Sequence, residues 1–183
     1  DVYKRQVLKL LVKKTEVGSD ISRIILTEEA PLSFEEDVID EANKIPQSLS
    51  EIDYQGREDF RDHLIVTIDG QDALDFDDAV EIKRVLNGYE IGVHIADVSN
   101  YVKSGSPIDL SAYERGTSIY VADRVVPMLP TQLSNGICSL NPDVDRLVMS
   151  VIMNVDKYGN VFKTRFSKGA VSYTHLRAHE TGA

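Results

Sequence analysis

The sequence is short of the residues that mark secreted and membrane proteins. It has no tryptophan and one cysteine, Cys138. A single cysteine cannot form an internal disulfide, so the simplest interpretation is a small buried side chain in a reducing compartment. No apolar run reaches the roughly 18 residues that a membrane span requires. The first apolar stretch, "VLKLLVKK", is too short and too soon broken by lysines to be a secretory leader.

Basic residues are in the minority. The chain has 20 lysines and arginines against 30 aspartates and glutamates, which gives a formal net charge of −10. General nucleic-acid binders are normally basic, so this chain would need a local site, assisted by cations, to contact nucleic acid. Its 183 residues, 42% of them hydrophobic, suffice for one domain with a core, or for one domain plus a fragment of another.

The two ends of the chain resemble sequence that does not belong to a fold. "DVYKRQ" and "SYTHLRAHETGA" are similar to translated sequencing-adapter sequence, so residues 1–6 and 171–183 are expected to be artefacts. His175 and His179 have the four-residue separation of a helical metal-binding pair. Glu180 follows the second histidine, which is not the metalloprotease arrangement, and we expect no metal site there.

Residues 7–27 predict the end of a small β-module. Lysine mixes with valine, leucine and isoleucine in "VLKLLVKK" and "ISRIILT", and "EVGSD" supplies a glycine-containing turn between two strands. Residues 28–60 predict an acidic linker, which should repel a phosphate backbone rather than bind it.

One amphipathic helix is predicted inside this linker. Ser33 and Glu36 have the spacing of a capping box, and Pro46 is expected to end the helix. Four apolar residues fall on one helical face: Val38, Ile39, Ala42 and Ile45.

From residue 61 the pattern is rich in strands. Residues 63–68 predict a short buried strand, and Asn87-Gly88 predicts the turn of a hairpin between residues 79–85 and 89–98. Ser106, Pro107 and Gly116 are typical of the cap, the first position and the end of a short helix. Further strands are predicted over 117–122, 146–156 and 161–167. The predicted fold class is therefore α+β with a mostly antiparallel sheet.

The stretch "TIDGQDALDFDDAV" carries five aspartates, namely Asp69, Asp72, Asp75, Asp77 and Asp78. Asp69 ends one predicted strand and the last three precede the next, so four carboxylates from two adjacent segments can converge after a tight turn at Gly70. No lysine or arginine lies between residues 67 and 81. The group would therefore repel itself and raise at least one pKa, unless a divalent cation neutralises it. Oxygen ligands shared with water and phosphate favour magnesium.

Other interpretations of the aspartates stay open. The group could be a polar turn between two strands. A twelve-residue calcium loop needs glycine at its sixth place and glutamate at its twelfth. Counting from Asp69 gives Leu74 and Val80, and counting from Asp75 gives Val80 and Leu86, so neither count fits. A glycosidase would use two separated carboxylates rather than a packed group of four.

Three stretches of the sequence resemble a known family. They are "RDHLIVTIDGQDALDFDDAVEI", "GVHIADVSNYV" and "SIYVADRVVPMLPTQLSNGICSLNPDVDRLVMSVIM". Their order and spacing are similar to the catalytic RNB domain of the RNase II/RNase R exoribonucleases, and most similar to RNase R. The resemblance covers residues 7–170. It implies the end of an OB-type, cold-shock-like module at 7–27, the acidic linker at 28–60 and the N-terminal part of the RNB domain at 61–170.

The resemblance implies hydrolysis of single-stranded RNA from its 3′ end, releasing 5′-nucleoside monophosphates. The four acidic positions of the family fall on Asp69, Asp75, Asp77 and Asp78, which would hold two magnesium ions, and Asp78 matches the most rate-critical of them. Asp72 is not one of the four. Tyr120 matches an aromatic that stacks on a nucleotide near the 3′ end, which suits degradation without sequence preference. The alternative for Tyr120 is an ordinary half-buried strand residue. The family also implies a monomeric, cytoplasmic protein with no membrane partner.

Two further residues of the family's motifs, His94 and Arg146, have two interpretations each. His94 and Asp97 belong to the signature "GVHIADVS", but a histidine between Val93 and Ile95 is more often a hydrogen-bonded structural group. Arg146 could contact phosphate or hold the loop beside it. The family domain continues beyond residue 170 with another aromatic, an arginine and a later RNA-binding module, so this stretch alone is expected to be incomplete as an enzyme. A non-catalytic RNA-binding or scaffolding relative is the alternative, although such a relative would be expected to lose some of the four carboxylates.

Overall fold

The computed structural model describes residues 21–23, 25, 31–70, 73–121 and 124–172. Its main feature in this part of the chain is a six-stranded sheet in the order β1-β8-β7-β4-β3-β2. The strands are β1 (Glu58–Asp59), β2 (Ile65–Val66), β3 (Asp78–Val85), β4 (Gly88–Ala96), β7 (Arg146–Val155) and β8 (Val161–Val171). Among the strands of this described sheet, β1 and β8 pair in parallel. The other neighbours are antiparallel, which confirms the predicted α+β class.

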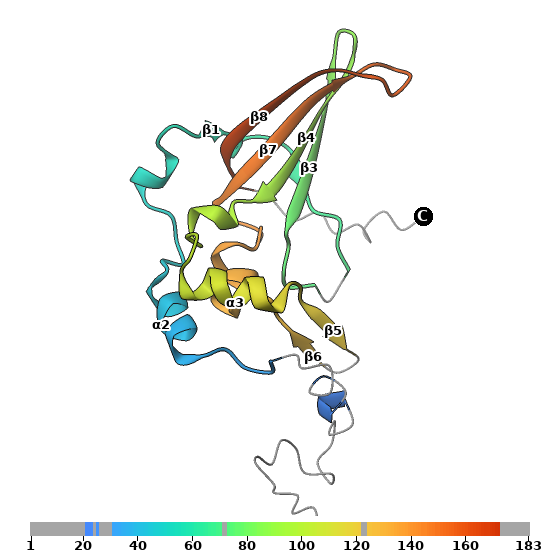
Figure 1. The fold of residues 1–183 in the computed structure, drawn as a ribbon. Helices are drawn as coiled ribbons and strands as arrows, with labels where there is room; N and C mark the ends of the chain where they lie inside the picture. The colour runs from blue at the N-terminus through green and yellow to red at the C-terminus, as the bar shows by residue number, and fades with distance from the viewer. Residues whose placement is uncertain (1–20, 24, 26–30, 71–72, 122–123, 173–183) are drawn as a thin grey trace, which may run out of the picture.

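Two long hairpins make up most of the sheet and extend away from the helices as a twisted ribbon (Figure 1). The first joins β3 to β4, as predicted, but its two-residue turn is Leu86-Asn87, one position before the predicted Asn87-Gly88. Gly88 already pairs with Val85 and has a φ of 141°. In the second hairpin, between β7 and β8, the Asp156 carboxylate accepts hydrogen bonds from the backbone of Tyr158 and Asn160 at 2.8 and 2.9 Å.

The two faces of the sheet have different surroundings. Ala79, His94 and Ser150 lie opposite one another on β3, β4 and β7, and all three are buried. The adjacent row, on the other face, runs through Val80, Val93, Val151 and Phe166. Phe166 is 80% exposed and the three valines are only half-buried, so this second face stays open to solvent in the described part of the chain.

The helices α2 (Glu36–Lys44) and α3 (Pro107–Arg115) pack beside each other below the sheet (Figure 1). For α3, the predicted Ser106 cap, first-turn proline and Gly116 end are all confirmed. For α2, Val38 and Ala42 are buried as predicted, and the helix stops before Pro46.

The capping box predicted for α2 is wrong. The helix is capped by Glu35, which makes no side-chain cap hydrogen bond. The backbone carbonyl of Ser33 instead accepts a 2.6 Å hydrogen bond from the Arg115 guanidinium, which also lies 3.9 Å over the Phe34 ring. A tertiary contact therefore sets the path of the chain into this helix.

The remaining elements complete the base of the fold. They are the short helical segments η1 (Glu51–Tyr54), η2 (Val98–Asn100) and η3 (Gln132–Ile137), and a small antiparallel sheet of β5 (Ile119–Val121) and β6 (Arg124–Val126). The buried core contains Val38 and Ala42 of α2, Ile108 of α3, and Leu133 and Ile137 of η3. It also takes in Ala79, Val148 and Ile152 from the long strands, so one core joins the linker helix to the sheet.

Two strand predictions fail where the structure can test them. Residues 63–68 contribute only the two-residue β2, and Leu64 and Ile68 are exposed. Within 7–27, the described residues Ile21, Ser22, Arg23 and Ile25 are helical rather than extended. The rest of that segment lies outside the described residues, as do Asp72, His175 and His179. In the described part of the chain, no helix combines the length and apolarity needed to cross a bilayer.

Candidate active site

The aspartate-rich segment connects β2 to β3 and reaches from the sheet towards β5 (Figure 1). Asp69 lies three residues beyond the end of β2, not at the strand end as predicted. A hydrogen bond of 3.1 Å from the Ala73 amide to the Gly70 carbonyl closes the turn after it. The β2–β3 register pairs Ile65 with Glu81 and Val66 with Val80. Continued past the strand ends, that register places Asp69 opposite Asp77.

Neighbouring segments fix the backbone around the other three aspartates. Asp78 is the first residue of β3 and pairs with Ile95 of β4. The Asp77 carbonyl accepts a 2.9 Å hydrogen bond from the Ala96 amide at the end of β4. The segment from Leu74 to Phe76, with Asp75 at its centre, is hydrogen-bonded to Ser139 and Leu140 after η3. The site is therefore built from the start of β3, the end of β4 and a loop that follows Asp75 by more than sixty residues in the sequence.

The carboxylates share one electrostatic field. Desolvation by the surrounding protein, followed by the charges of Asp75, Asp78 and Asp69, raises the pKa of Asp77 above its ordinary value, although Asp77 lies at the surface. Among the described residues, Asp69 has a buried Oδ2 atom without a hydrogen-bond partner. Crowded carboxylates with an unpartnered oxygen are the donor chemistry that a hard divalent cation satisfies.

The carboxylates do not form a closed metal cage. Within the residues that the structure describes, no three histidine, cysteine, aspartate or glutamate side chains are placed to hold a metal ion. Magnesium commonly binds through one or two carboxylates and completes its coordination with water and substrate phosphate. The predicted convergence of four carboxylates on one ion is therefore not what the described structure has, and a magnesium site here would use one or two of them together with water and phosphate. The sequence prediction that the four aspartates hold two ions stays a prediction.

Tyr120 of β5 lies beside the aspartates. Its hydroxyl donates a hydrogen bond to the Asp75 carboxylate, and this bond, ahead of burial, raises the pKa of Tyr120 to about 12. The side chain is 63% exposed, so the ring remains available to a ligand. The sequence motif indicated an aromatic near the site, but it did not indicate the hydrogen bond to Asp75.

His94 has the structural surroundings that its position between two apolar residues suggested. It is fully buried, and its Nδ1 lies 2.8 Å from the Ser150 hydroxyl oxygen. Its Nε2 lies 3.6 Å from Glu81, whose other oxygen is 2.7 Å from His63. Burial lowers the pKa of His94 more than the Glu81 charge raises it. Gly92, opposite Glu81, makes room for this group, because a Cβ there would lie 2.6 Å from Glu81 Cγ.

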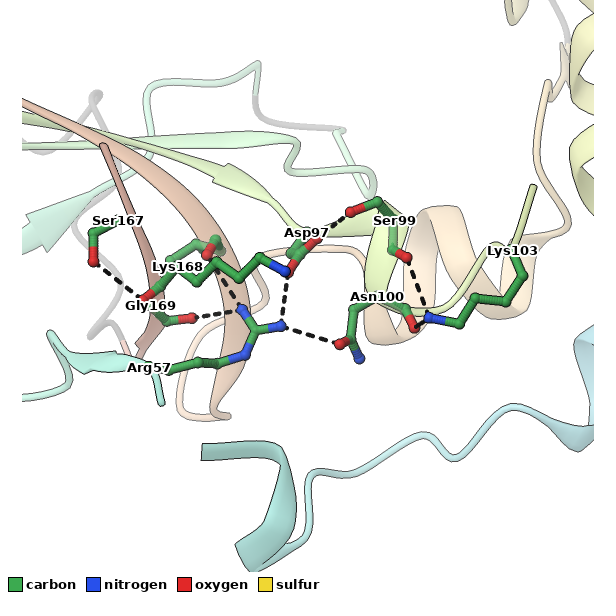
Figure 2. Close-up of polar contacts among 9 residues, drawn as sticks. Arg57, Asp97, Ser99, Asn100, Lys103, Ser167, Lys168 and Gly169 are labelled. Carbon is green, nitrogen blue, oxygen red and sulfur yellow. Dashed lines mark hydrogen bonds and ion pairs between the residues drawn. The ribbon is translucent and has the colours of Figure 1, made fainter. Parts of the chain in front are cut away.

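Asp97 is occupied by an ion pair with Arg57 (Figure 2). Arg57 Nη2 lies 2.7 Å from the carboxylate, and the Ser99 hydroxyl donates to the same group at 2.7 Å. Burial raises the pKa of Asp97. The hydrogen bonds from Ser99 and Arg57, together with the Arg57 charge, lower it by more, so the net shift is downward. Sequence reasoning missed Arg57, because no local pattern links it to a residue forty positions away.

Arg146 holds the loop beside it, which is one of its two predicted roles. The residue is buried, its Nε donates to the Ser139 carbonyl at 2.9 Å, and its Nη1 donates to the Asp145 carbonyl at 3.0 Å. Ser139 is the residue that anchors the Asp75 segment. The buried thiol of Cys138 precedes it, with a pKa raised to about 12, chiefly by burial.

Comparison with known proteins identifies the family to which this fold belongs. The model of the RNB domain family matches residues 57–177, and the chain belongs to that family. Ribonuclease R 1 of Lactococcus lactis subsp. lactis (strain IL1403) is 45% identical over 175 residues, which are 95% of this chain and 21% of that protein. This chain therefore spans about a fifth of that relative's length.

Two solved structures with this fold differ in activity as their descriptions state it. Mycoplasma genitalium RNase R in complex with ribose methylated single-stranded RNA has a TM-score of 0.81 and 33% identity, over 86% of this chain and 25% of that one. Yeast Ssd1, a pseudonuclease, has a TM-score of 0.73 over 94% of this chain and 23% of that one. At 20% identity, that second likeness shows the fold alone. The fold therefore does not by itself separate a nuclease from a non-catalytic relative, and the aspartates must carry that distinction.

Proposed function

We propose that this chain is part of a 3′→5′ exoribonuclease that hydrolyses single-stranded RNA to 5′-nucleoside monophosphates with magnesium. The observation that carries the proposal is the aspartate group between β2 and β3. All four carboxylates of the family motif are present, and desolvation together with the charges of the other three raises the pKa of the fourth, Asp77. Such a group is unfavourable unless a cation and an RNA phosphate complete it.

The four aspartates have distinct structural settings in this proposal. Asp69 would offer its unpartnered Oδ2, and Asp77 the carboxylate that gains most from a neighbouring cation. Asp75 is oriented by Tyr120, and Asp78 is held by its pairing to β4. Magnesium, when bound, would polarise the scissile phosphate, lower the pKa of the attacking water and stabilise the departing 3′ oxygen.

Tyr120 would position the RNA. Its exposed ring can stack on a base of any identity, and its hydroxyl, held by Asp75, keeps the ring at the edge of the site. The partner in the proposal is the 3′ end of single-stranded RNA, bound by a monomeric protein in the cytoplasm. A buried free thiol at Cys138 is compatible with a reducing compartment.

The test compares Asp78→Asn with Asp72→Asn in the full-length protein that carries this chain. The two changes remove the same charge from the same segment, but only Asp78 belongs to the proposed group. With single-stranded poly(A) as substrate and magnesium present, we expect Asp78→Asn to abolish release of nucleoside monophosphates while RNA binding persists. Asp72→Asn should cleave like the wild type. Normal cleavage by Asp78→Asn would refute the assignment of the group.

A non-catalytic RNA-binding role is the second candidate, because a pseudonuclease has the same fold. Calorimetric titration of the full-length protein with magnesium separates the two. Magnesium binding that disappears in the Asp69→Asn variant favours the enzyme. RNA binding with no carboxylate-dependent magnesium binding favours the scaffold.

A further inference from the structure

The Ser139 hydroxyl bridges the two peptide groups on either side of Asp75. Ser139 is fully buried. Its Oγ accepts a hydrogen bond from the Phe76 amide at 3.0 Å and donates to the Leu74 carbonyl at 3.1 Å. The next residue, Leu140, donates its amide to the Phe76 carbonyl at 2.8 Å. The chain on both sides of Asp75 is thereby attached to one loop.

That loop is itself fixed in place. The Ser139 amide donates to the Gly136 carbonyl of η3 at 3.1 Å. The Ser139 carbonyl accepts from Arg146 at 2.9 Å and from the Asn141 amide at 2.8 Å. With its own backbone held from both sides, Ser139 can act as a fixed reference for the Asp75 segment rather than move with it.

We propose that Ser139 is a positioning residue that sets Asp75 for metal binding, with Tyr120 as the second tether. Ser139 fixes the backbone on both sides of Asp75, and Tyr120 fixes the carboxylate from β5. The inference rests on the proposed function, in which Asp75 holds magnesium. Removing a group that hydrogen-bonds to a metal ligand and orients it typically lowers metal affinity or activity by roughly 10- to 100-fold.

A serine that only stabilises the fold would behave differently. Losing a buried hydroxyl and leaving its partners unsatisfied destabilises a protein wherever it occurs. Ser150 provides the matched control, because it is also buried and its hydroxyl oxygen lies 2.8 Å from His94 Nδ1. Ser150 bonds no residue of the Asp75 segment, so Ser150→Ala measures the cost of a lost buried hydroxyl without the effect on Asp75.

The experiment measures manganese binding to the full-length protein without RNA, by electron paramagnetic resonance of free Mn²⁺. The binding component that disappears in Asp75→Asn defines the site. We expect Ser139→Ala to weaken that component about tenfold, and to raise by a similar factor the magnesium concentration for half-maximal cleavage. Excess magnesium should restore the cleavage rate. Ser150→Ala should lower the melting temperature comparably and leave both metal measurements unchanged.

Two outcomes would overturn the inference. One is a Ser139→Ala protein with lowered melting temperature and wild-type manganese affinity. The other is an equal loss of manganese affinity in Ser150→Ala. If Ser139→Ala does not fold, Ser139→Cys replaces it, because a thiol retains a weak donor and acceptor. We expect Ser139→Cys to bind manganese more weakly than the wild type, but more tightly than Asp75→Asn. Asp78→Asn is assayed in parallel: if it is inactive while Ser139→Ala binds manganese normally, the proposed function stands and only the role of Ser139 fails.

Discussion

Arg57 and Asp97 form a buried ion pair that attaches the chain entering the domain to the end of β4. The side chains are 7% and 1% exposed, and the nitrogen–oxygen distance is 2.7 Å. Arg57 also donates to Asn100 Oδ1 at 3.0 Å and to the Gly169 carbonyl at 3.4 Å (Figure 2). Its Nη1 donates to the Val148 carbonyl at 3.5 Å as well. One guanidinium therefore joins η2, β7 and β8. The amide of Ala96 donates to the Asp77 carbonyl, so Asp97 directly follows the residue that holds the backbone of the site.

Removing Arg57 should destabilise the protein strongly. Arg57→Ala leaves the Asp97 charge buried without its cation, for which a loss of about 3–5 kcal/mol is typical. Arg61→Ala is the control, because Arg61 is 39% exposed and its ion pairs with Asp59 at 2.7 Å and Asp145 at 3.2 Å are both open to solvent. An exposed pair contributes about 0–1 kcal/mol. Chemical denaturation of both variants checks this, and losses of equal size would contradict the role of burial.

Asp77→Asn should stabilise the metal-free protein at neutral pH. The change removes the carboxylate whose pKa is raised by desolvation and by three neighbouring charges. A gain of about 1 kcal/mol would raise the melting temperature by roughly 2–4 °C. We expect this gain in a chelating buffer, together with loss of RNA cleavage when magnesium is restored. A lower melting temperature in the chelating buffer would show that Asp77 is not under electrostatic strain.

His94 should make stability fall as the solution becomes acidic. Burial lowers its pKa in the folded protein, whereas the unfolded chain takes up the proton near pH 6.5. The unfolded state therefore binds more protons below about pH 6.5, and the free energy of unfolding decreases there by at most about 1.4 kcal/mol per pH unit. His94→Asn should reduce the difference in melting temperature between pH 7.5 and pH 5.5. An unchanged difference would exclude His94 as its source.

Tyr120 should reveal separate roles for its ring and its hydroxyl. Tyr120→Ala removes the stacking surface and should weaken binding of single-stranded RNA by about 1–3 kcal/mol. Tyr120→Phe keeps the ring but loses the hydrogen bond to Asp75, so RNA affinity should hold while the magnesium requirement for cleavage rises. Fluorescence anisotropy with an uncleavable RNA and a magnesium titration of the cleavage rate measure the two effects. Equal RNA affinity of the alanine variant and wild type would rule out stacking.

Features that depend on near neighbours were predictable from the sequence. The cap, first proline and terminal glycine of α3 lie within eleven residues, and both long hairpins join strands adjacent in the chain. The hairpin turn was displaced by one residue, because the backbone register rather than the Asn-Gly pair fixes which two residues remain unpaired. The α2 cap failed because Arg115, more than seventy residues away, binds the Ser33 carbonyl.

The aspartate motif, its spacing and its family were set by the order of residues alone, since a short segment between two strands keeps its charges near enough to act on Asp77. Packing decided the rest: which face of the sheet is covered, that Ser139 holds the chain around Asp75, and that Arg57 neutralises Asp97. Each of these contacts joins residues forty or more positions apart. Their partners are chosen by the shape and burial of the whole core, and no local pattern in the sequence records that choice.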